Sequence, residues 1–346
     1  MTLKRENMNN YLLKNENAIY YESGFSCDNV FFLSLGREKF FITDPRYSSE
    51  AKECVKEGIE VVETKDLYKS LRNIIRKNNI KKLFFNPLDI SYGDYLEISK
   101  ITTLFLNPKK EFSKIKRIIK SDDEIKLLKK ASLLGKEGFL NLATRLDKGM
   151  SEFDINYLAK EALSHKGLYD LSFDPITAIE ANAAKPHALP MKTKLYKNNL
   201  LLIDAGLKYK RYCSDRTVTL NYKSNLDIAN RKQKFKDPFK QKIYDIVLKA
   251  QEKAISKARA GMKANEIDKL ARSVIEDAGY GKYFIHSTGH GVGLDIHEYP
   301  IISQKSDIVI EENMVFTIEP GIYLDDKFGV RIEDSVAIQN GKAVIL

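Results

Sequence analysis

The chain has 346 residues, of which 43% are hydrophobic, and this is enough for two ordinary domains with apolar cores. Its formal net charge of +10 comes with no nucleic-acid-binding motif, so we expect the two lysine-rich stretches, 109–120 and 223–242, to be a solvated linker and loop. No apolar run reaches the length of a membrane span, and the polar first ten residues predict no signal peptide. Three widely spaced cysteines favour a reduced, cytoplasmic setting.

The first third of the chain alternates strand and helix patterns. Short apolar runs joined at Gly36 predict a hairpin. The predicted strands are 30–35, 39–43, 59–62 and 82–85. The predicted helices are 45–56, which opens on Pro45, and 67–77, which has apolar residues at helical spacing. These elements predict a small α/β domain with a mixed sheet, spanning residues 1–115.

A polar, lysine-rich stretch at 107–120 marks the predicted domain boundary. The pairs Ser121–Glu124 and Ser151–Asp154 have the spacing of capping boxes and predict the starts of two helices. The second of these helices is expected to end near 167, and two later helices are predicted at 238–260 and 264–278. The predicted strands are 175–179, 200–204, 216–220 and three short ones after 314. Residues 121–346 are therefore predicted to form an α+β domain, with helices flanking an antiparallel sheet.

Four of the five histidines lie beside glycine, proline or acidic residues in turn-rich segments: His187, His286, His290 and His297. A single histidine is usually a packing or surface residue. Four in such surroundings indicate a functional site. The fifth, His165, is outside these segments, and we expect it to be a surface helix residue.

Two aspartates occupy the ends of predicted strands. Asp204 closes the apolar run 200–203, and Asp215 opens the next strand. Because an unpaired buried charge is costly, each carboxylate needs a partner. The loop 207–213 can join the strands as a hairpin, so we expect both carboxylates at one end of the sheet.

Two glutamates repeat this pattern near the C-terminus. Glu319 and Glu333 lie inside the predicted apolar strands 314–324 and 330–338, which a polar turn joins. Alternation along the second strand places Arg331 on the same face as Glu333. Two hairpins would then bring four acids to one pocket, where they cannot converge without cations. The alternative, four unrelated surface acids, fits poorly with their apolar surroundings.

His290 adds a nitrogen ligand to these oxygens. It lies in the glycine-rich stretch 288–293, where we expect the glycines to let the backbone approach a ligand closely. A nucleotide-binding loop is excluded because no helix pattern follows. One nitrogen with several carboxylates best matches Mn²⁺, with Co²⁺, Fe²⁺ or Zn²⁺ able to substitute. Four acids exceed the needs of one catalytic zinc and suit two divalent metal ions.

These residues fall within six short motifs whose order and spacing resemble the pita-bread metallopeptidases (M24B), in the branch of Xaa-Pro aminopeptidases and prolidases. The motifs are Asp204-Ala-Gly, Ser214-Asp215-Arg-Thr, His286-Ser-Thr-Gly-His290-Gly-Val-Gly, His297-Glu-Tyr-Pro, Ile318-Glu319-Pro-Gly and Arg331-Ile-Glu333-Asp. The resemblance covers nearly the whole chain. It implies a creatinase-like N-terminal domain followed by a pita-bread catalytic domain.

The resemblance also implies a role for each ligand. Asp204 would bind one metal, His290 and Glu319 the other, and Asp215 and Glu333 would bridge both. A water bridging the two metals would attack the scissile carbonyl carbon. Glu319 would serve as general base or proton shuttle.

Four further pocket residues follow from the same resemblance. His187 would contact the substrate near the scissile bond, and His297 would stabilise the developing oxyanion. His286 and Arg331 would complete the pocket, although a purely structural role for His286 is equally compatible with its motif. Thr217 shares a strand face with Asp215, and we expect it to orient that carboxylate.

The family implies proline-containing peptides as substrates and a homodimer in which N-terminal domains help close the sites. Several prolidase-type members carry an arginine just after the His-Glu-x-Pro motif, where this chain has Ile301. An apolar residue cannot neutralise a dipeptide's carboxylate, so we expect an aminopeptidase, with an Xaa-Pro dipeptidase as the alternative. Creatinase-like hydrolases and non-catalytic relatives lack the complete ligand set. Methionine aminopeptidases have their two glutamates much further apart than Glu319 and Glu333.

Overall fold

The computed structural model of the protein describes residues 8–101, 103–223 and 226–346. Most of the polar N-terminal stretch and residues 224–225 of the basic stretch lie outside these ranges. The chain divides into two units, one up to Arg117 and one from Ile118 to Leu346. Among the described residues, every helix is too short or too polar to cross a membrane.

The N-terminal unit is built on a six-stranded mixed sheet with the order β4-β3-β2-β1-β5-β6. The predicted hairpin is present, with β2 antiparallel to β3, whereas β4, β5 and β6 join by parallel pairing. The strands are β1 (Asn10–Leu13), β2 (Val30–Leu35), β3 (Glu38–Thr43), β4 (Ile59–Glu63), β5 (Lys82–Phe85) and β6 (Phe105–Pro108). The helices are α1 (Glu16–Ser23), α2 (Pro45–Cys54), α3 (Leu67–Lys77), α4 (Tyr92–Ser99) and α5 (Phe112–Lys116).

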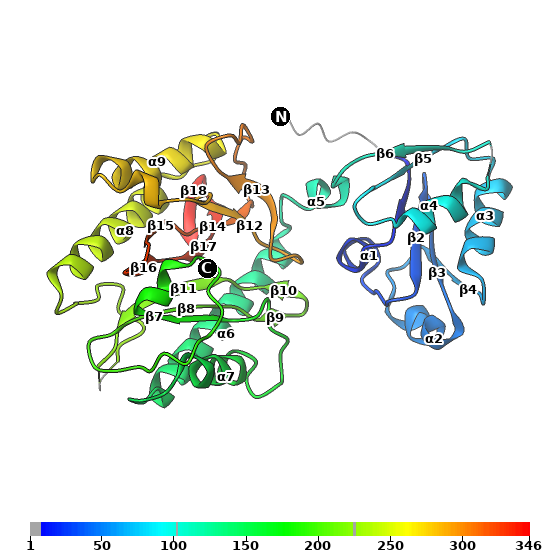
Figure 1. Ribbon diagram of the computed structural model, residues 1–346. Coiled ribbons are helices and arrows are strands. Elements are labelled where there is room, and N and C mark those ends of the chain that lie inside the picture. The colour runs from blue at the N-terminus through cyan, green and yellow to red at the C-terminus, as the bar shows by residue number, and fades with distance from the viewer. Residues whose placement is uncertain (1–7, 102, 224–225) are drawn as a thin grey trace. The chain divides into compact units, whose positions relative to one another are not determined.

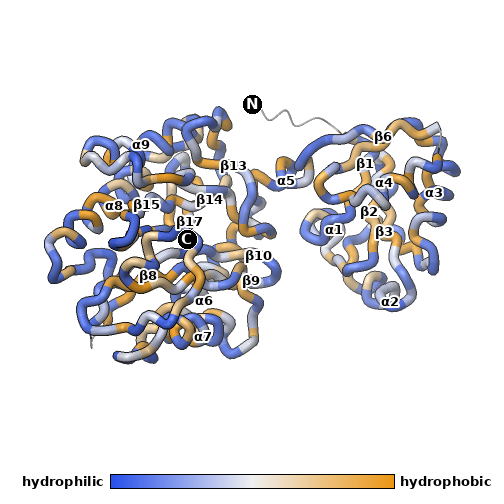
Figure 2. Tube along the Cα trace, in the orientation of Figure 1, coloured by the Kyte–Doolittle hydropathy of each residue, from blue (hydrophilic) through white to orange (hydrophobic). Residues whose placement is uncertain are grey.

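Alternation along β2 explains why this sheet has an apolar core on each face. Phe31 and Leu33 pack into one buried cluster, whereas Val30 and Phe32 pack into another on the opposite face. Figure 2 shows hydrophobic residues running through the strands of this unit. Strands that are buried on both faces suit an α/β layer arrangement.

The C-terminal unit places antiparallel sheets between two helix pairs, with α6 and α7 on one side and α8 and α9 on the other (Figure 1). The helices are α6 (Asp122–Arg145), α7 (Glu152–Leu163), α8 (Pro238–Lys257) and α9 (Ala264–Asp277). The strands are β7 (Ile176–Ile179), β8 (Leu200–Ala205), β9 (Lys208–Tyr209), β10 (Tyr212–Cys213), β11 (Arg216–Asn221), β12 (Gly289–Gly291), β13 (Glu298–Ile302), β14 (Val315–Ile318), β15 (Gly321–Leu324), β16 (Phe328–Arg331), β17 (Asp334–Gln339) and β18 (Lys342–Ile345). The predicted α+β class is confirmed.

Both predicted capping boxes begin helices in this unit. The Ser121 hydroxyl accepts from the Glu124 amide at the start of α6, and Ser151 accepts from Asp154 at the start of α7. Helix α7 ends at Leu163, earlier than predicted, because His165 and Lys166 adopt left-handed backbone angles.

The sequence predicted three short strands after 314, with strands at 314–324 and 330–338, and this part of the prediction was wrong. The stretch 314–324 breaks into β14 and β15, and 330–338 breaks into β16 and β17, so the tail holds five short strands. Pro320 has no N–H to donate to a continuing ladder, which accounts for the first break. Glu319 and Glu333 therefore lie in the breaks between strands.

Neither lysine-rich stretch is simply solvated. Lys120 is buried, and its Nζ lies 2.9 Å from Glu298 Oε2. In the second stretch, Arg231 Nη1 lies 2.6 Å from the buried Asp334. Basic residues that were expected to face solvent thus form ion pairs within the C-terminal unit.

Candidate metal centre

The first two acids lie at one end of a strand pair. Strands β8 and β11 are antiparallel, with Thr217 opposite Asp204, and Asp215 immediately precedes β11. Both carboxylates are buried, with relative exposures of 8% for Asp204 and 7% for Asp215. The hairpin expected from the sequence therefore brings two charged groups to the same apolar region.

The other two acids are held by threonines from neighbouring strands. The Thr217 hydroxyl donates to Glu333 Oε2 at 2.6 Å, and the Thr317 hydroxyl to Glu319 Oε1 at 3.3 Å. Thr217 was expected to orient Asp215, but its hydroxyl is directed to Glu333. The difference arises because the backbone of Glu333 pairs directly with that of Thr217 across β11.

His290 lies in the three-residue strand β12, between β13 and β14. A Cβ atom on Gly289 would lie 1.9 Å from Thr317 O, and one on Gly291 would lie 2.2 Å from Tyr299 O. The flanking glycines therefore allow neighbouring strands to approach, and not a ligand as the sequence led us to expect. This close packing fixes the backbone that carries the imidazole.

The hydrogen bonding of His290 leaves one ring nitrogen available as a ligand. Nδ1 lies 3.1 Å from Gly291 O, and because a carbonyl can only accept, Nδ1 carries the proton. The lone pair of Nε2 is then directed at acids, 3.6 Å from Asp215 Oδ2 and 3.4 Å from Glu319 Oε1. Burial, followed by the nearby His297, lowers the pKa of His290 to about 4, so the ring is neutral near pH 7.

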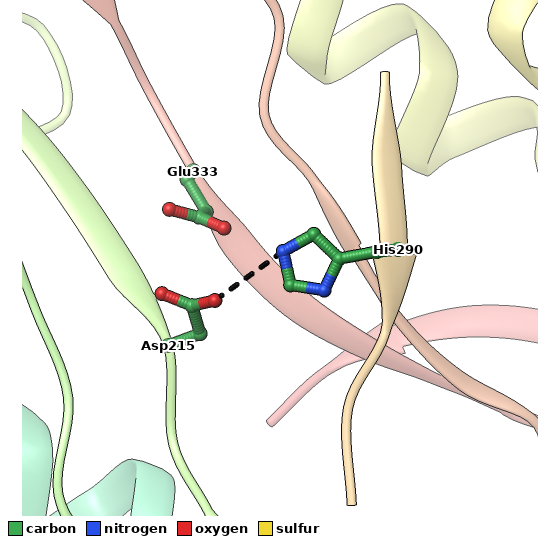
Figure 3. Close-up of side chains that lie close together, drawn as sticks. All are labelled: Asp215, His290 and Glu333. Carbon is green, nitrogen blue, oxygen red and sulfur yellow. Dashed lines mark ion pairs between the residues drawn. The ribbon is translucent and has the colours of Figure 1, made fainter. Parts of the chain in front are cut away.

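Asp215, His290 and Glu333 point toward one another from three different segments (Figure 3). Within the described chain, their ligand atoms lie within 4.8 Å of one another. Ligands from segments this far apart in the sequence meet only in the folded state.

Electrostatics favour a cation among these groups. Burial is the main cause that raises the pKa of Asp215 and Glu333 well above the ordinary range, and the neighbouring carboxylates add to it. Burial likewise raises the pKa of Glu319 to about 8, against the lowering effect of Arg331. Ionising all of these groups together requires positive charge between them.

The donor set fits divalent metal ions. Asp204 Oδ1 is buried and has no hydrogen-bond partner among the described residues, which leaves a carboxylate oxygen free to coordinate. Carboxylate oxygens and one neutral imidazole nitrogen are ligands that Mn²⁺, Fe²⁺, Co²⁺ and Zn²⁺ accept. All five predicted ligand residues line the same cavity.

Arg331 connects the acids to the pocket wall. Its Nη2 donates to Asp204 Oδ2 at 2.7 Å, its Nε to the Thr217 hydroxyl at 3.0 Å, and its Nη1 to the Tyr323 hydroxyl at 2.9 Å. The Tyr323 oxygen lies 2.8 Å from His286 Nε2, and His286 Nδ1 lies 2.7 Å from Ser287 O. Burial, aided by Arg331, lowers the pKa of His286 to about 4, so the neutral ring accepts from Tyr323. Tyr323 was not predicted, although it follows Glu319 in the same apolar stretch.

A cavity of about 560 Å³ opens onto these groups, and Ile301 lines it. His187 and His297 are exposed and lie on its wall with His286. The His297 and His290 rings are 4.3 Å apart. The cavity thus gathers all nine predicted site residues, whereas His165 lies elsewhere, with Nε2 2.9 Å from Leu134 O. Polar wall residues that the sequence did not reveal include Asn156, Lys160 and Asp174.

This fold and this pocket define a metal-dependent peptidase of the two-domain, pita-bread type. The chain belongs to metallopeptidase family M24, because the family model matches residues 126–340, and its relatives place it in the branch that holds Xaa-Pro aminopeptidases and prolidases. The model of the Creatinase/Prolidase N-terminal domain matches residues 2–125.

Individual relatives extend this similarity over the full chain. An Xaa-Pro dipeptidase of Pyrococcus horikoshii is 35% identical over 339 residues, which is 95% of this chain and 90% of the relative. The solved structure of an Xaa-Pro dipeptidase from Bacillus anthracis superimposes with a TM-score of 0.90 at 32% identity, covering 98% of this chain and 92% of that one. An X-Pro aminopeptidase from Thermotoga maritima superimposes with a TM-score of 0.87 at 31% identity, covering 98% and 95%.

Proposed function

We propose that the protein hydrolyses the peptide bond between an N-terminal residue and a following proline, as an Xaa-Pro aminopeptidase that uses two divalent metal ions. The observation that carries the proposal is the convergence of four carboxylates and the Nε2 lone pair of His290 on a cavity of about 560 Å³. A cavity of this volume accommodates several residues of a peptide.

The family resemblance supports a division of the ligands between the two ions. Asp204 would hold one ion, His290 and Glu319 the other, and Asp215 and Glu333 both, with Mn²⁺ as the proposed metal. When bound, such ions lower the pKa of water and polarise the scissile carbonyl. The hydroxyl of Thr217 keeps Glu333 oriented for this role.

The remaining chemistry falls to side chains of the chain itself. Glu319 accepts the proton that the attacking water loses and delivers it to the departing proline nitrogen. His297, exposed on the cavity wall, donates a hydrogen bond to the carbonyl oxygen as negative charge develops on it. His187 holds the substrate beside the scissile bond, while Arg331 and His286 keep the wall behind it fixed through Tyr323.

An Xaa-Pro dipeptidase is the second candidate. The names of the Pyrococcus horikoshii and Bacillus anthracis relatives support it. The apolar Ile301 on the cavity wall supports the aminopeptidase, because a dipeptide leaves a free carboxylate directly after proline that this side chain cannot neutralise.

The two candidates separate on substrate length. With Mn²⁺ present, we expect a higher kcat/KM for an Xaa-Pro-Xaa tripeptide than for the matching Xaa-Pro dipeptide, and no hydrolysis after chelation. Asp215→Asn and Glu333→Gln should lose both activity and bound metal. Full activity in either variant would contradict the ligand assignment.

We also propose that the protein works as a homodimer in the cytoplasm. The family resemblance supports the dimer, and three free cysteines support a reducing compartment. Sedimentation of the Mn²⁺-loaded protein measures the assembly directly, and a monomer at all concentrations would contradict it.

A further inference from the structure

Glu152 is a buried carboxylate that the proposed chemistry does not use. It occupies the first turn of α7 and has no solvent exposure. Its Oε1 accepts from the Ile179 amide at 2.7 Å, and its Oε2 accepts from the Met191 amide at 2.6 Å and from Asn182 Nδ2 at 2.7 Å. Three hydrogen bonds thus satisfy both oxygens of this buried carboxylate and connect it to three other residues.

The donors bracket the segment that carries His187 into the cavity. Ile179 ends β7 just before that segment, and Met191 follows it, so one carboxylate closes its two ends. Asn182 ties the middle, because its Nδ2 also donates to Leu189 O at 2.9 Å. The backbone of Glu152 adds a further tie, its amide donating to Thr193 O at 3.1 Å.

Arg331 fixes the same segment from the cavity side. Its Nη1 donates to Pro186 O at 3.1 Å, at the residue just before His187. His187 therefore lies between Pro186, which Arg331 of the metal centre holds, and two later anchors. Asn182 holds Leu189, and Glu152 on α7 holds Met191. Its imidazole is exposed on the cavity wall and makes no hydrogen bond to another described residue, so its position depends on the backbone that bears it.

We infer that Glu152 is a positioning residue, which acts on catalysis by holding the His187 segment in place. The inference rests on the proposed function for its kinetic readout. A carboxylate is required because all three groups that face it are donors. Glutamine would keep the shape of the side chain, but its NH₂ group cannot accept a hydrogen bond. In one orientation this group would face the donors of Asn182 and Met191, and in the other it would face the amide of Ile179.

A double-mutant cycle tests this role. Glu152→Gln should lower kcat roughly tenfold to a hundredfold, with the Mn²⁺ dissociation constant unchanged, because the segment shifts while the metal ligands stay in place. In a His187→Ala background the same change should cost less than about twofold, since there is no imidazole left to misplace. Glu161→Gln, on the same helix and paired with Arg145 near the surface, is the matched control and should leave kcat unchanged.

Two results would overturn the inference. One is an equal loss of kcat from Glu152→Gln with and without His187, which is what a general loss of packing would produce. The other is an unchanged kcat in Glu152→Gln. If that variant does not fold, Asn182→Ala, which removes the middle tie without burying a new charge, is put through the same cycle and judged by the same two criteria.

Hydrogen exchange separates this inference from the proposed function. In the Mn²⁺-loaded protein, Glu152→Gln should speed amide exchange in residues 180–191. The amide exchange rates of β8, β11 and β12, which contain or adjoin Asp204, Asp215 and His290, should not change. If the wild-type chain does not cleave Xaa-Pro bonds, the proposed function fails, and this measurement still decides whether Glu152 holds the segment. Unchanged exchange in 180–191 would overturn the positioning role whatever the substrate.

Discussion

Arg331 Nη2 lies 2.7 Å from Asp204 Oδ2, so a buried guanidinium neutralises one of the four acids of the metal centre. The same side chain reaches Thr217, Tyr323 and the backbone of Pro186. Arginine alone offers donors in this spread geometry. Arg331 thus links a metal ligand, a threonine that orients another ligand, and the segment that bears His187.

Replacing Arg331 by methionine should destabilise the metal-free protein more than the metal-loaded one. Without its partner, Asp204 remains buried and uncompensated, which typically costs about 3–5 kcal/mol. Bound Mn²⁺ supplies positive charge at the same carboxylate and should reduce that loss. Urea unfolding with a chelator and then with Mn²⁺ measures both values.

Arg145→Met is the control, because Arg145 pairs with Glu161 at a partly exposed site. Its loss should cost at most about 1 kcal/mol, and equally in the two conditions. An Arg331→Met destabilisation that does not depend on metal would show that the guanidinium does not serve the charge of Asp204.

Thr217→Val should weaken metal binding. The Thr217 hydroxyl donates to Glu333 Oε2 at 2.6 Å and accepts from Arg331 Nε at 3.0 Å, so valine leaves both groups free to turn. Loss of such an outer contact typically lowers metal affinity roughly tenfold to a hundredfold. Titration calorimetry with Mn²⁺ gives the dissociation constant.

Thr219→Val provides a closely matched comparison. Thr219 is buried in the same strand, but its hydroxyl exchanges hydrogen bonds with the backbone of Arg331 and does not contact a carboxylate. It should therefore lower stability and leave the Mn²⁺ dissociation constant within about twofold. Equal losses of affinity in the two variants would contradict a specific role for Thr217.

The sequence revealed the ligands more clearly than the elements that carry them. Asp204 and Asp215 could be placed because an acid at the end of an apolar run is unusual, and the hairpin between them is local. Glu319 could be identified, but its strand could not be divided correctly, because apolar stretches lie both before Glu319 and after Gly321. The proline itself was the signal for the break.

The parts that could not be predicted depend on contacts between distant segments. Strand β12 is three residues long and rich in glycine, so its strand character comes only from β13 and β14 on either side. Glu152 follows a recognisable capping serine, yet its partners, Ile179 and Met191, are remote in sequence. Hydrophobic periodicity within a short window of sequence cannot predict contacts between such distant residues.

The pKa of Glu319 predicts how metal binding depends on pH. In the metal-free protein burial raises this pKa from 4.5 to about 8, so the folded state retains the proton over that range. A raised folded-state pKa contributes stability below about 4.5, and that contribution is lost as the pH rises through about 8. Asp215 and Glu333, whose pKa values are also raised, act in the same direction.

Mn²⁺ must displace these protons, so its apparent affinity should rise as the pH increases toward about 8. Calorimetric titrations of the metal-depleted protein, repeated in buffers with different ionisation enthalpies, count the protons released. Unfolding of the metal-depleted protein should show falling stability over the same interval. An affinity independent of pH, with no proton release, would contradict the buried and protonated state of these acids.

Ile301→Arg should shift the substrate preference toward dipeptides. Ile301 lines the cavity together with His297 and Arg331, and a guanidinium at this position could pair with the carboxylate that follows proline in a dipeptide. A hydrogen bond to a charged group contributes about 1.5–3 kcal/mol, and each 1.4 kcal/mol corresponds to about tenfold in affinity. The ratio of kcat/KM for an Xaa-Pro dipeptide to that for an Xaa-Pro-Xaa tripeptide should therefore rise roughly tenfold to a hundredfold. Ile301→Gln, polar but uncharged, should leave the ratio nearly unchanged, and a rise of equal size in both variants would exclude carboxylate pairing as its cause.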